Sequence, residues 1–255
     1  MNAKFFIFPV IFVYLSFAGG LTAGQKKADV PKDWQRVYLA SFPRSGNHWV
    51  RYLIEEASLI ATSSVRRDRH PQHLKKAFPW GGFCADHGYT GNCRYPQKED
   101  IVLIKTHFPA GRRASQFDGF PFVQTIRLIR HPVDSFYSEY VRRLGLQGEQ
   151  PLEKIPHQLV IELIDIWKRF QNYWDNQKDV VTIRYEDILD NPSENLKTIL
   201  LMINYKVEDA DIERAVAKYP PEGFVLKHKD KFDPEDLELI NLKLKIYMKK
   251  FGYSI

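Results

Sequence analysis

Short apolar runs rich in β-branched residues alternate with longer amphipathic stretches along most of the chain. The short runs predict strands, each followed by a polar or proline-bearing turn, at residues 36–41, 101–107, 122–129 and 180–185. The longer stretches have helical spacing and predict helices at residues 47–58, 132–144, 152–176, 192–203, 209–218 and 234–250. Asp233 and Pro234 suit the cap and the first position of the last helix. Residues 64–100 fit neither pattern and are expected to form a long insert.

This alternation determines the expected fold class. Strands that alternate with helices form βα units, and such units pair their strands in parallel. The strand candidates are almost continuously apolar, which is typical of strands covered on both faces. We therefore predict an α/β fold of three layers, a parallel sheet with helices on both faces. The 255 residues suffice for one sizeable domain, at 36–255 after a short linker at 25–35.

An apolar leader precedes the linker. Lys4 is followed by an uncharged stretch at residues 5–24 that ends in Thr22, Ala23 and Gly24, a pattern typical of a secretory signal peptide and its cleavage site. The stretch is also just long enough to cross a bilayer, so an uncleaved signal anchor is the alternative for residues 1–24. Both interpretations direct the protein to the secretory pathway, in the Golgi lumen or secreted, with membrane contact only through this stretch.

The overall charge favours anionic partners. Lysine and arginine number 37 against 31 aspartate and glutamate, a formal net charge of +6. Nucleotides, acidic polysaccharides, nucleic acids and membrane surfaces are all compatible with that charge, but no nucleic-acid-binding motif is present. A basic run in the insert could bind an acidic saccharide or simply form a solvated face. This run contains Arg66, Arg67, Arg69, Lys75 and Lys76.

The chain has two cysteines, Cys84 and Cys93, on either side of a glycine-containing turn. In an oxidising lumen they are well placed for a local disulfide. A zinc site is a weaker interpretation, because no second cysteine pair and no His-x-x-x-His spacing accompanies them. Two unpaired surface thiols are the third alternative.

The stretch SFPRSGNHWV, which begins at Ser41, joins a predicted strand to a predicted helix. A helix N-terminus offers unpaired N–H groups and partial positive charge, so a loop that holds Arg44 here predicts a phosphate or sulfate site. In the register of a Walker A loop the defining positions are Ser41, Gly46, Asn47 and His48, and three of these four differ from the motif. Without the lysine and the magnesium-binding hydroxyl, hydrolysis of a nucleoside triphosphate is not expected.

Two further segments carry side chains suited to binding and catalysis. Arg130 ends a predicted strand, and Ser138 lies two turns into the helix that Pro132 begins, so a guanidinium and a hydroxyl can reach one phosphate. His107 ends another predicted strand, two residues after Lys105, and histidine is the side chain best suited to remove a hydroxyl proton near neutral pH. Taken singly, such an arginine or histidine is more often structural.

Together and in this order, these segments resemble the PAPS-dependent sulfotransferases, where PAPS is 3′-phosphoadenosine 5′-phosphosulfate. FPRSGNHW is similar to the loop pattern Pro-[Lys/Arg]-Ser-Gly-Thr-Thr-Trp, IKTHFP to Lys-[Ser/Thr]-His-x-Pro, and RHPVDSFYS to Arg-x-Pro-x-Asp-x-x-x-Ser. A fourth match is the Tyr-Glu-Asp that begins at Tyr185, and the C-terminal MKKFGY is a weak fifth. The resemblance covers residues 37–253 and implies a sulfotransferase domain with a P-loop-like fold.

The resemblance also implies a role for each matching residue. His107 would act as the general base, with Arg44 and Lys105 as the other catalytic residues and Trp49 beside the adenine. The residues that would bind PAPS, the co-substrate, are Arg44, Ser45, Gly46, Asn47, His48, Trp49, Arg130, Ser138 and Tyr185. No metal is required, because cations and N–H donors meet the charge of the donor.

The chain departs from the family pattern at several positions. Asn47 and His48 replace the common Thr-Thr pair, and Arg44 replaces the lysine that is usual in cytosolic members. The Arg-Lys-Gly segment near the C-terminus of those members is absent. The nearest basic cluster, residues 227–229, could take part of its role at the 3′-phosphate; it consists of Lys227, His228 and Lys229.

The expected reaction is transfer of a sulfuryl group from PAPS to a hydroxyl, with a carbohydrate as the favoured acceptor because of the expected lumenal location. Aromatic residues that could line an acceptor cleft are Trp80, Phe83, Tyr89, Phe108 and Phe120. One alternative is an ATP-dependent small-molecule kinase with a degenerate phosphate loop. Another is a catalytically inactive lumenal protein that binds PAP, the donor without its sulfuryl group. The sequence does not indicate an oligomeric state.

Overall fold

The computed structural model describes residues 37–64, 101–110, 124–145, 153–223 and 225–255. The predicted leader, the linker, both cysteines and the basic run of the insert lie outside the described residues. The same holds for four of the five aromatic residues expected to line an acceptor cleft, Trp80, Phe83, Tyr89 and Phe120.

Five parallel strands form one sheet in the order β2-β3-β1-β4-β5. Four of them match the apolar runs: β1 (Val37–Ser41), β3 (Ile101–Thr106), β4 (Gln124–Ile129) and β5 (Val180–Arg184). The fifth, β2 (Ala61–Ser64), is short and polar, so its sequence did not predict it. Tertiary contacts stabilise it instead: β2 pairs with β3, and the Thr62 backbone N–H donates to the Glu55 carboxylate of α1 at 2.7 Å.

Strand β1 lies at the centre of the sheet and is buried along its whole length. Leu39 of this strand pairs with Lys105 of β3 on one side and with Ile126 of β4 on the other. The chain therefore proceeds from β1 toward β2 and β3 on one side of the sheet and then crosses to β4 and β5 on the other. Parallel sheets bind ligands at the carboxyl ends of the strands where this order reverses.

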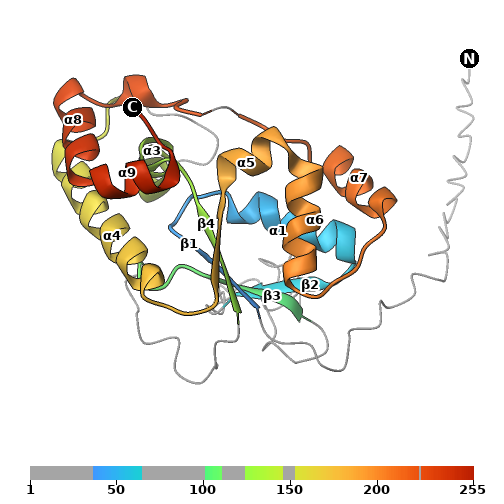
Figure 1. The fold of residues 1–255 in the computed structure, drawn as a ribbon. Helices are drawn as coiled ribbons and strands as arrows, with labels where there is room; N and C mark the ends of the chain where they lie inside the picture. Colours follow the sequence, from blue (N-terminus) through green and yellow to red (C-terminus); the bar gives the residue numbers. More distant parts are fainter. Residues whose placement is uncertain (1–36, 65–100, 111–123, 146–152, 224) are drawn as a thin grey trace, which may run out of the picture.

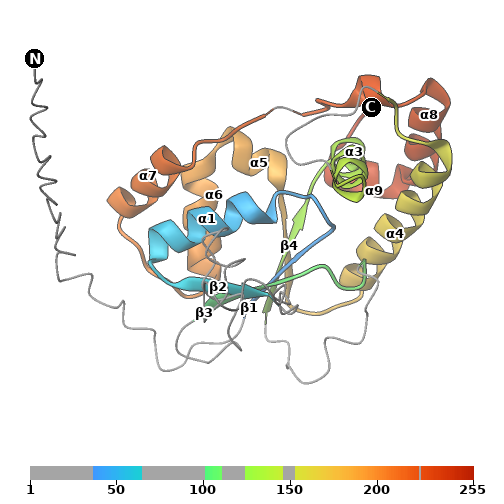
Figure 2. The same cartoon turned by 180° about the vertical axis from the view of Figure 1, so that it is seen from behind.

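Helices cover both faces of the sheet (Figures 1 and 2). One face carries α1 (Asn47–Ser58), α5 (Tyr185–Asp190), α6 (Pro192–Met202) and α7 (Asp209–Lys218). The other carries α3 (Pro132–Arg143), α4 (His157–Asp175), α8 (Pro234–Lys243) and α9 (Lys245–Phe251). Each helical layer buries its own apolar core against the sheet. The predicted three-layer α/β fold with a parallel sheet is confirmed.

Several element boundaries differ from the sequence-based expectation. Helix α4 begins at His157, directly after Pro156, rather than at residue 152. The predicted helix at 234–250 is interrupted at Leu244, which is fully buried, and α9 then packs its aromatic residues on Trp167. No glycine or proline marks this interruption, so only the tertiary contacts account for it. The carboxylate of Asp233 does not cap α8, because it pairs with the Lys154 ammonium at 2.7 Å.

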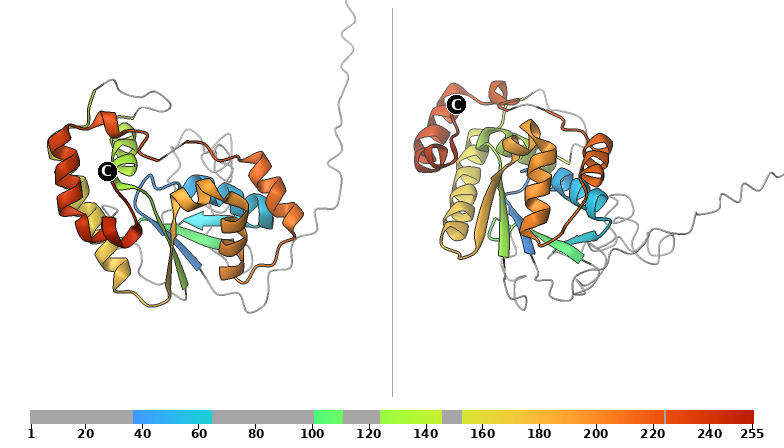
Figure 3. Two further views of the ribbon diagram at one scale, coloured as in Figure 1. Left: turned by 45° about the horizontal axis from the view of Figure 1, so that its top comes forward. Right: turned by 45° about the vertical axis from the view of Figure 1, so that its right-hand side comes forward.

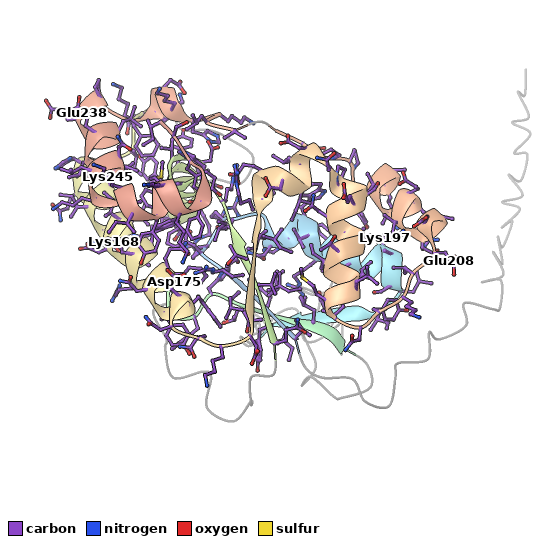
Figure 4. All side chains as sticks on the ribbon, viewed as in Figure 1. Lys168, Asp175, Lys197, Glu208, Glu238 and Lys245 are labelled. Carbon is purple, nitrogen blue, oxygen red and sulfur yellow. The ribbon has the colours of Figure 1, made fainter. Side chains whose placement is uncertain are left out.

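A partly buried ion pair joins the sheet to α4. Arg127, in the middle of β4, donates to Asp175 at 2.7 Å and to the Thr182 hydroxyl of β5 at 2.9 Å. Asp175 lies in the last turn of α4 (Figure 4) and also accepts from Lys250 of α9 at 2.6 Å. Loss of Asp175 would leave the buried Arg127 guanidinium without its carboxylate partner, so this contact stabilises the packing of α4 and α9 beside the sheet.

The C-terminal tail folds back beside α3, onto the strand ends (Figure 3). Gly252, at φ +67°, ends α9 and turns the chain. The Tyr253 hydroxyl donates to Glu186 at 2.8 Å, and the same carboxylate accepts the His131 backbone N–H at 2.8 Å. The His131 ring contacts the Ser254 carbonyl at 3.1 Å. The tail thus joins the residue that follows Arg130 to the residue that follows Tyr185.

We expect His131 to make the protein sensitive to acid. Its Nδ1 accepts the Val133 N–H and its Nε2–H donates to the Ser254 carbonyl, so the ring is neutral. Burial of the ring lowers the pKa of His131 to about 4. In the unfolded chain the His131 side chain has an ordinary pKa near 6.5 and therefore binds a proton more readily than in the folded protein. The free energy of unfolding is thus expected to fall by roughly 3 kcal/mol in total as the pH decreases from about 6.5 to about 4.

Urea unfolding at several pH values checks this expectation. The His131→Asn variant keeps an acceptor for the first turn of α3 but cannot titrate. Its free energy of unfolding is therefore expected to depend less steeply on pH than that of the wild type. Equal slopes in the two proteins would show that His131 is not responsible.

Candidate active site

The strand order brings the sequence motifs together at one edge of the sheet. The loop that contains Arg44 follows β1, His107 follows the neighbouring β3, and Arg130 follows β4 on the other side. Tyr185 follows β5, the next strand outward. All four motifs therefore lie at the carboxyl ends of adjacent strands, around the position where the strand order reverses.

The loop between β1 and α1 has the geometry of an anion site. The Ser45 N–H donates to the Phe42 carbonyl at 3.3 Å, and Arg44 and Gly46 both have left-handed backbone conformations, with φ +67° and +88°. The first-turn N–H groups of α1 point out of the helix without intrahelical acceptors. The buried Ser45 hydroxyl also has no hydrogen-bond partner among the described residues. These donors suit a phosphate or phosphosulfate group.

Tyr185 packs against the loop and fixes its position. A methyl group built at Gly46 would lie 2.2 Å from the Tyr185 ring, so glycine is required here by space as well as by its φ. The guanidinium of Arg130 lies over the same ring, 4.8 Å from its centroid. Trp49 meets it edge-on at 5.7 Å. Tyr185 thus connects the loop, the first helix and Arg130.

The residues expected to bind the two ends of PAPS contact one another directly. The Arg44 Nε donates to the Ser138 hydroxyl at 2.9 Å, although 94 positions separate the two residues. Arg130 donates through one Nη to the Arg44 carbonyl at 3.1 Å. Burial lowers the pKa of Arg44; the charge of Glu139 opposes this effect, and the charges of Arg142 and Arg130 add to it. An arginine nevertheless keeps its proton at neutral pH.

His107 has the tautomer and charge that a general base requires. Its Nδ1 lies 2.7 Å from the Ser41 carbonyl, which can only accept, so Nδ1 carries the proton and Nε2 is free of it. Burial lowers the pKa of His107 well below 6.5, and the charge of Lys105 adds to this effect. The imidazole is therefore neutral near pH 7. Ser41 also accepts through its hydroxyl from Asn47 of the loop, at 3.2 Å.

The remaining predicted residues take less direct positions. The Trp49 indole N–H donates to the Tyr219 carbonyl at 2.9 Å, so it joins α1 to the end of α7 and only the ring can face a ligand. His48 is exposed in the first turn of α1, and its charge lowers the pKa of His107. Phe108 packs edge-on against Tyr173 of α4, at 4.8 Å.

Asp134 has a structural role that the motif alone did not reveal. Its carboxylate accepts the backbone N–H of Leu226 at 2.8 Å and that of His228 at 3.2 Å. Burial opposes ionisation, but hydrogen bonds from His228 and the charge of Arg130 outweigh it and lower the pKa of Asp134. The His228 ring stacks on Tyr137 at 4.7 Å. Asp134 therefore holds residues 226–228 at the start of α3.

The part of the chain that the structure describes holds neither a candidate metal site nor a candidate membrane span. Within it, no group of three or more histidine, cysteine, aspartate or glutamate side chains is arranged to hold a metal ion. None of its helices combines the length and the apolarity needed to cross a bilayer.

The fold and the site together define a class of protein. A parallel α/β sheet with an anion-binding loop between its central strand and the following helix is the architecture of P-loop-like nucleotide-binding proteins. The family model of the sulfotransferase domain matches residues 35–220. The chain therefore belongs to the sulfotransferase domain family.

Curated relatives align with most of the chain. Proteins described as WSCD family members from Drosophila pseudoobscura pseudoobscura and Drosophila melanogaster are each 26% identical over 208 residues, which cover 77% of this chain. The matched region spans only 59% of the length of these relatives.

The solved structures support the fold alone. A sulfotransferase from Mycobacterium avium aligns with a TM-score of 0.55 at 12% identity, over 89% of this chain and 79% of its own. A mouse sulfotransferase complexed with PAP aligns with a TM-score of 0.53 at 17% identity, over 86% of each chain. The predicted P-loop-like sulfotransferase fold is thus confirmed.

Proposed function

We propose that the protein transfers a sulfuryl group from PAPS to a hydroxyl acceptor, with a carbohydrate as the favoured acceptor. The observation that carries the proposal is the direct contact of Arg44, Ser138 and Arg130 beside a loop that ends in a helix N-terminus. A neutral imidazole with an unprotonated Nε2 follows the adjacent strand. The expected lumenal location, which favours a glycan acceptor, is part of the same proposal.

The residues at the site fit the donor. Arg130 and Ser138 supply a guanidinium and a hydroxyl for its 3′-phosphate. Arg44, the Ser45 hydroxyl and the first-turn amides of α1 supply donors for its 5′-phosphosulfate. When bound, PAPS provides a sulfur atom that is open to attack and a phosphate that can leave.

Side chains and backbone amides of the site would accept the proton of the acceptor hydroxyl and stabilise the charge on the leaving phosphate. His107 Nε2 accepts the hydroxyl proton as the acceptor oxygen bonds to sulfur and the bond from sulfur to the leaving phosphate oxygen breaks. Arg44 and the loop amides stabilise the negative charge that this leaves on the phosphate. Lys105, whose charge already acts on His107, supports the transferred group.

The kinase alternative requires a different donor and a metal. A kinase would bind ATP with magnesium, whereas the loop has neither the lysine nor the hydroxyl that this chemistry uses. Calorimetric titration with PAP and with ATP and magnesium separates the two. An inactive protein would bind PAP but transfer no radiolabelled sulfate from PAPS to a panel of glycans, peptides and phenols.

Arg130→Met tests the 3′-phosphate assignment. Loss of a charge-assisted contact is expected to lower PAP affinity about 10- to 100-fold. Affinity for adenosine 5′-phosphosulfate, which lacks the 3′-phosphate, should change little. Arg184→Met is the matched control, because Arg184 ends the adjacent strand but lies over Tyr253, 4.9 Å from its ring centroid. Equal losses for both nucleotides would contradict the assignment.

A further inference from the structure

Arg142 is a cation beside the site that takes no part in the proposed transfer reaction. Arg142 lies one helical turn beyond Ser138 on α3, and side chains four positions apart are neighbours on a helix surface. Since Ser138 contacts Arg44, Arg142 lies next along the same face of α3. Its charge also lowers the pKa of both Arg44 and His107, in agreement with this position.

Glu139 holds this guanidinium in a defined orientation. Its carboxylate accepts from the Arg142 Nε at 2.6 Å and from Nη2 at 2.5 Å, and also from the Arg143 Nε at 3.1 Å. The Glu139 side chain is 4% exposed, whereas that of Arg142 is 54% exposed. A buried carboxylate therefore orients an accessible guanidinium, and that arrangement reduces the entropy lost when a second anion binds.

The local charges leave a positive surplus. Glu139 is shared by Arg142 and Arg143, and Arg143 also pairs with Glu162 at 3.1 Å. Arg44 lies close by with its guanidinium on a neutral hydroxyl. Among the described residues, three guanidinium groups thus share two carboxylates, those of Glu139 and Glu162, so this cluster carries a net positive charge.

From this geometry we propose that Arg142 forms an anion subsite for the acceptor, which binds a carboxylate or sulfate of an acidic saccharide while a nearby hydroxyl faces His107. The inference rests on the proposed function. It assigns Arg142 to the acceptor rather than to the donor, because Arg142 lies beyond Ser138 on α3, at the end away from Arg130. A guanidinium can bind a carboxylate or a sulfate through two parallel hydrogen bonds.

A matched pair of saccharides tests the subsite. The probes are a chondroitin hexasaccharide, which carries glucuronate carboxylates, and the same hexasaccharide with its carboxyl groups reduced, each titrated into PAP-loaded protein. We expect the wild type to bind the acidic hexasaccharide more tightly than the reduced one. In Arg142→Ala the ratio of the two affinities should be about tenfold smaller. Arg142→Lys should lose part of it, because an ammonium cannot form two parallel bonds.

Arg143→Ala is the control, because Arg143 donates to the same carboxylate and its removal also takes a guanidinium away from Glu139. It should keep the preference of the wild type. A wild type without preference, or an equal loss in both variants, would overturn the subsite. So would a fall in PAP affinity of Arg142→Ala with unchanged preference, which would assign Arg142 to the donor. If the wild type does not bind PAP, the proposed function fails, and the titrations without PAP still decide the anion preference.

Discussion

His107→Ala is expected to lower the rate of sulfuryl transfer by about 10²- to 10⁴-fold, the usual contribution of a general base. The variant removes the Nε2 that accepts the acceptor proton but leaves Arg44, Ser138 and Arg130 in contact. PAP affinity should therefore stay close to that of the wild type. Single-turnover transfer from radiolabelled PAPS, with PAP binding by calorimetry, measures the two properties separately.

The pH dependence of the rate gives an independent check. Because burial and the charge of Lys105 lower the pKa of His107, the neutral base persists below pH 6.5, and the acid limb of kcat should lie at lower pH than for an ordinary histidine. Lys105→Met removes one cause of this shift, so it should move the acid limb to higher pH. Normal turnover in His107→Ala, or an acid limb unmoved in Lys105→Met, would contradict these assignments.

Gly46→Ala is expected to damage both stability and donor binding. A left-handed φ costs an alanine about 1–2 kcal/mol, and overpacking against the Tyr185 ring adds about 1–3 kcal/mol. The cost spreads to the donor site, because Tyr185 also carries the guanidinium of Arg130. Displacement of the ring should therefore reduce PAP affinity in the same variant.

Gly145→Ala is the matched control for this effect. Gly145 also has a left-handed φ, +74°, but a methyl group there would meet no atom within 4 Å. The control should show the backbone cost alone and leave PAP affinity unchanged. Urea unfolding and PAP titration are measured for both variants. The difference between the variants gives the effect of the clash with Tyr185. Equal stability losses with normal PAP binding in both would mean that the loop and Tyr185 adjust freely.

Local sequence patterns determined most of the elements and the position of each motif at the end of a strand. Apolar runs predicted four strands because burial on both faces selects β-branched residues regardless of which strands are neighbours. The loop at Ser41 and the helix start at Pro132 were also readable, because turn geometry and helix termini depend on adjacent residues. The same locality explains why the sequence alone could suggest an anion site at this loop.

Contacts between distant residues required the tertiary structure. The polar strand β2 forms because β3 offers it an edge, and α8 and α9 separate where Leu244 enters the core. The sequence shows Gly46 as a loop residue, but not that the ring of Tyr185 occupies the space beside it. The pair of Glu139 and Arg142 looks like ordinary helix charge until its burial and its place beside Arg44 are known.

The sequence by itself thus determined the chemical groups, the family resemblance and the helix or strand that carries each group. Only the tertiary structure decided that β1 lies between β3 and β4, which brings His107, Arg44 and Arg130 to one edge of the sheet. The physical reason is that strand order and side-chain packing depend on contacts between residues far apart in the sequence. No local sequence pattern links these residues.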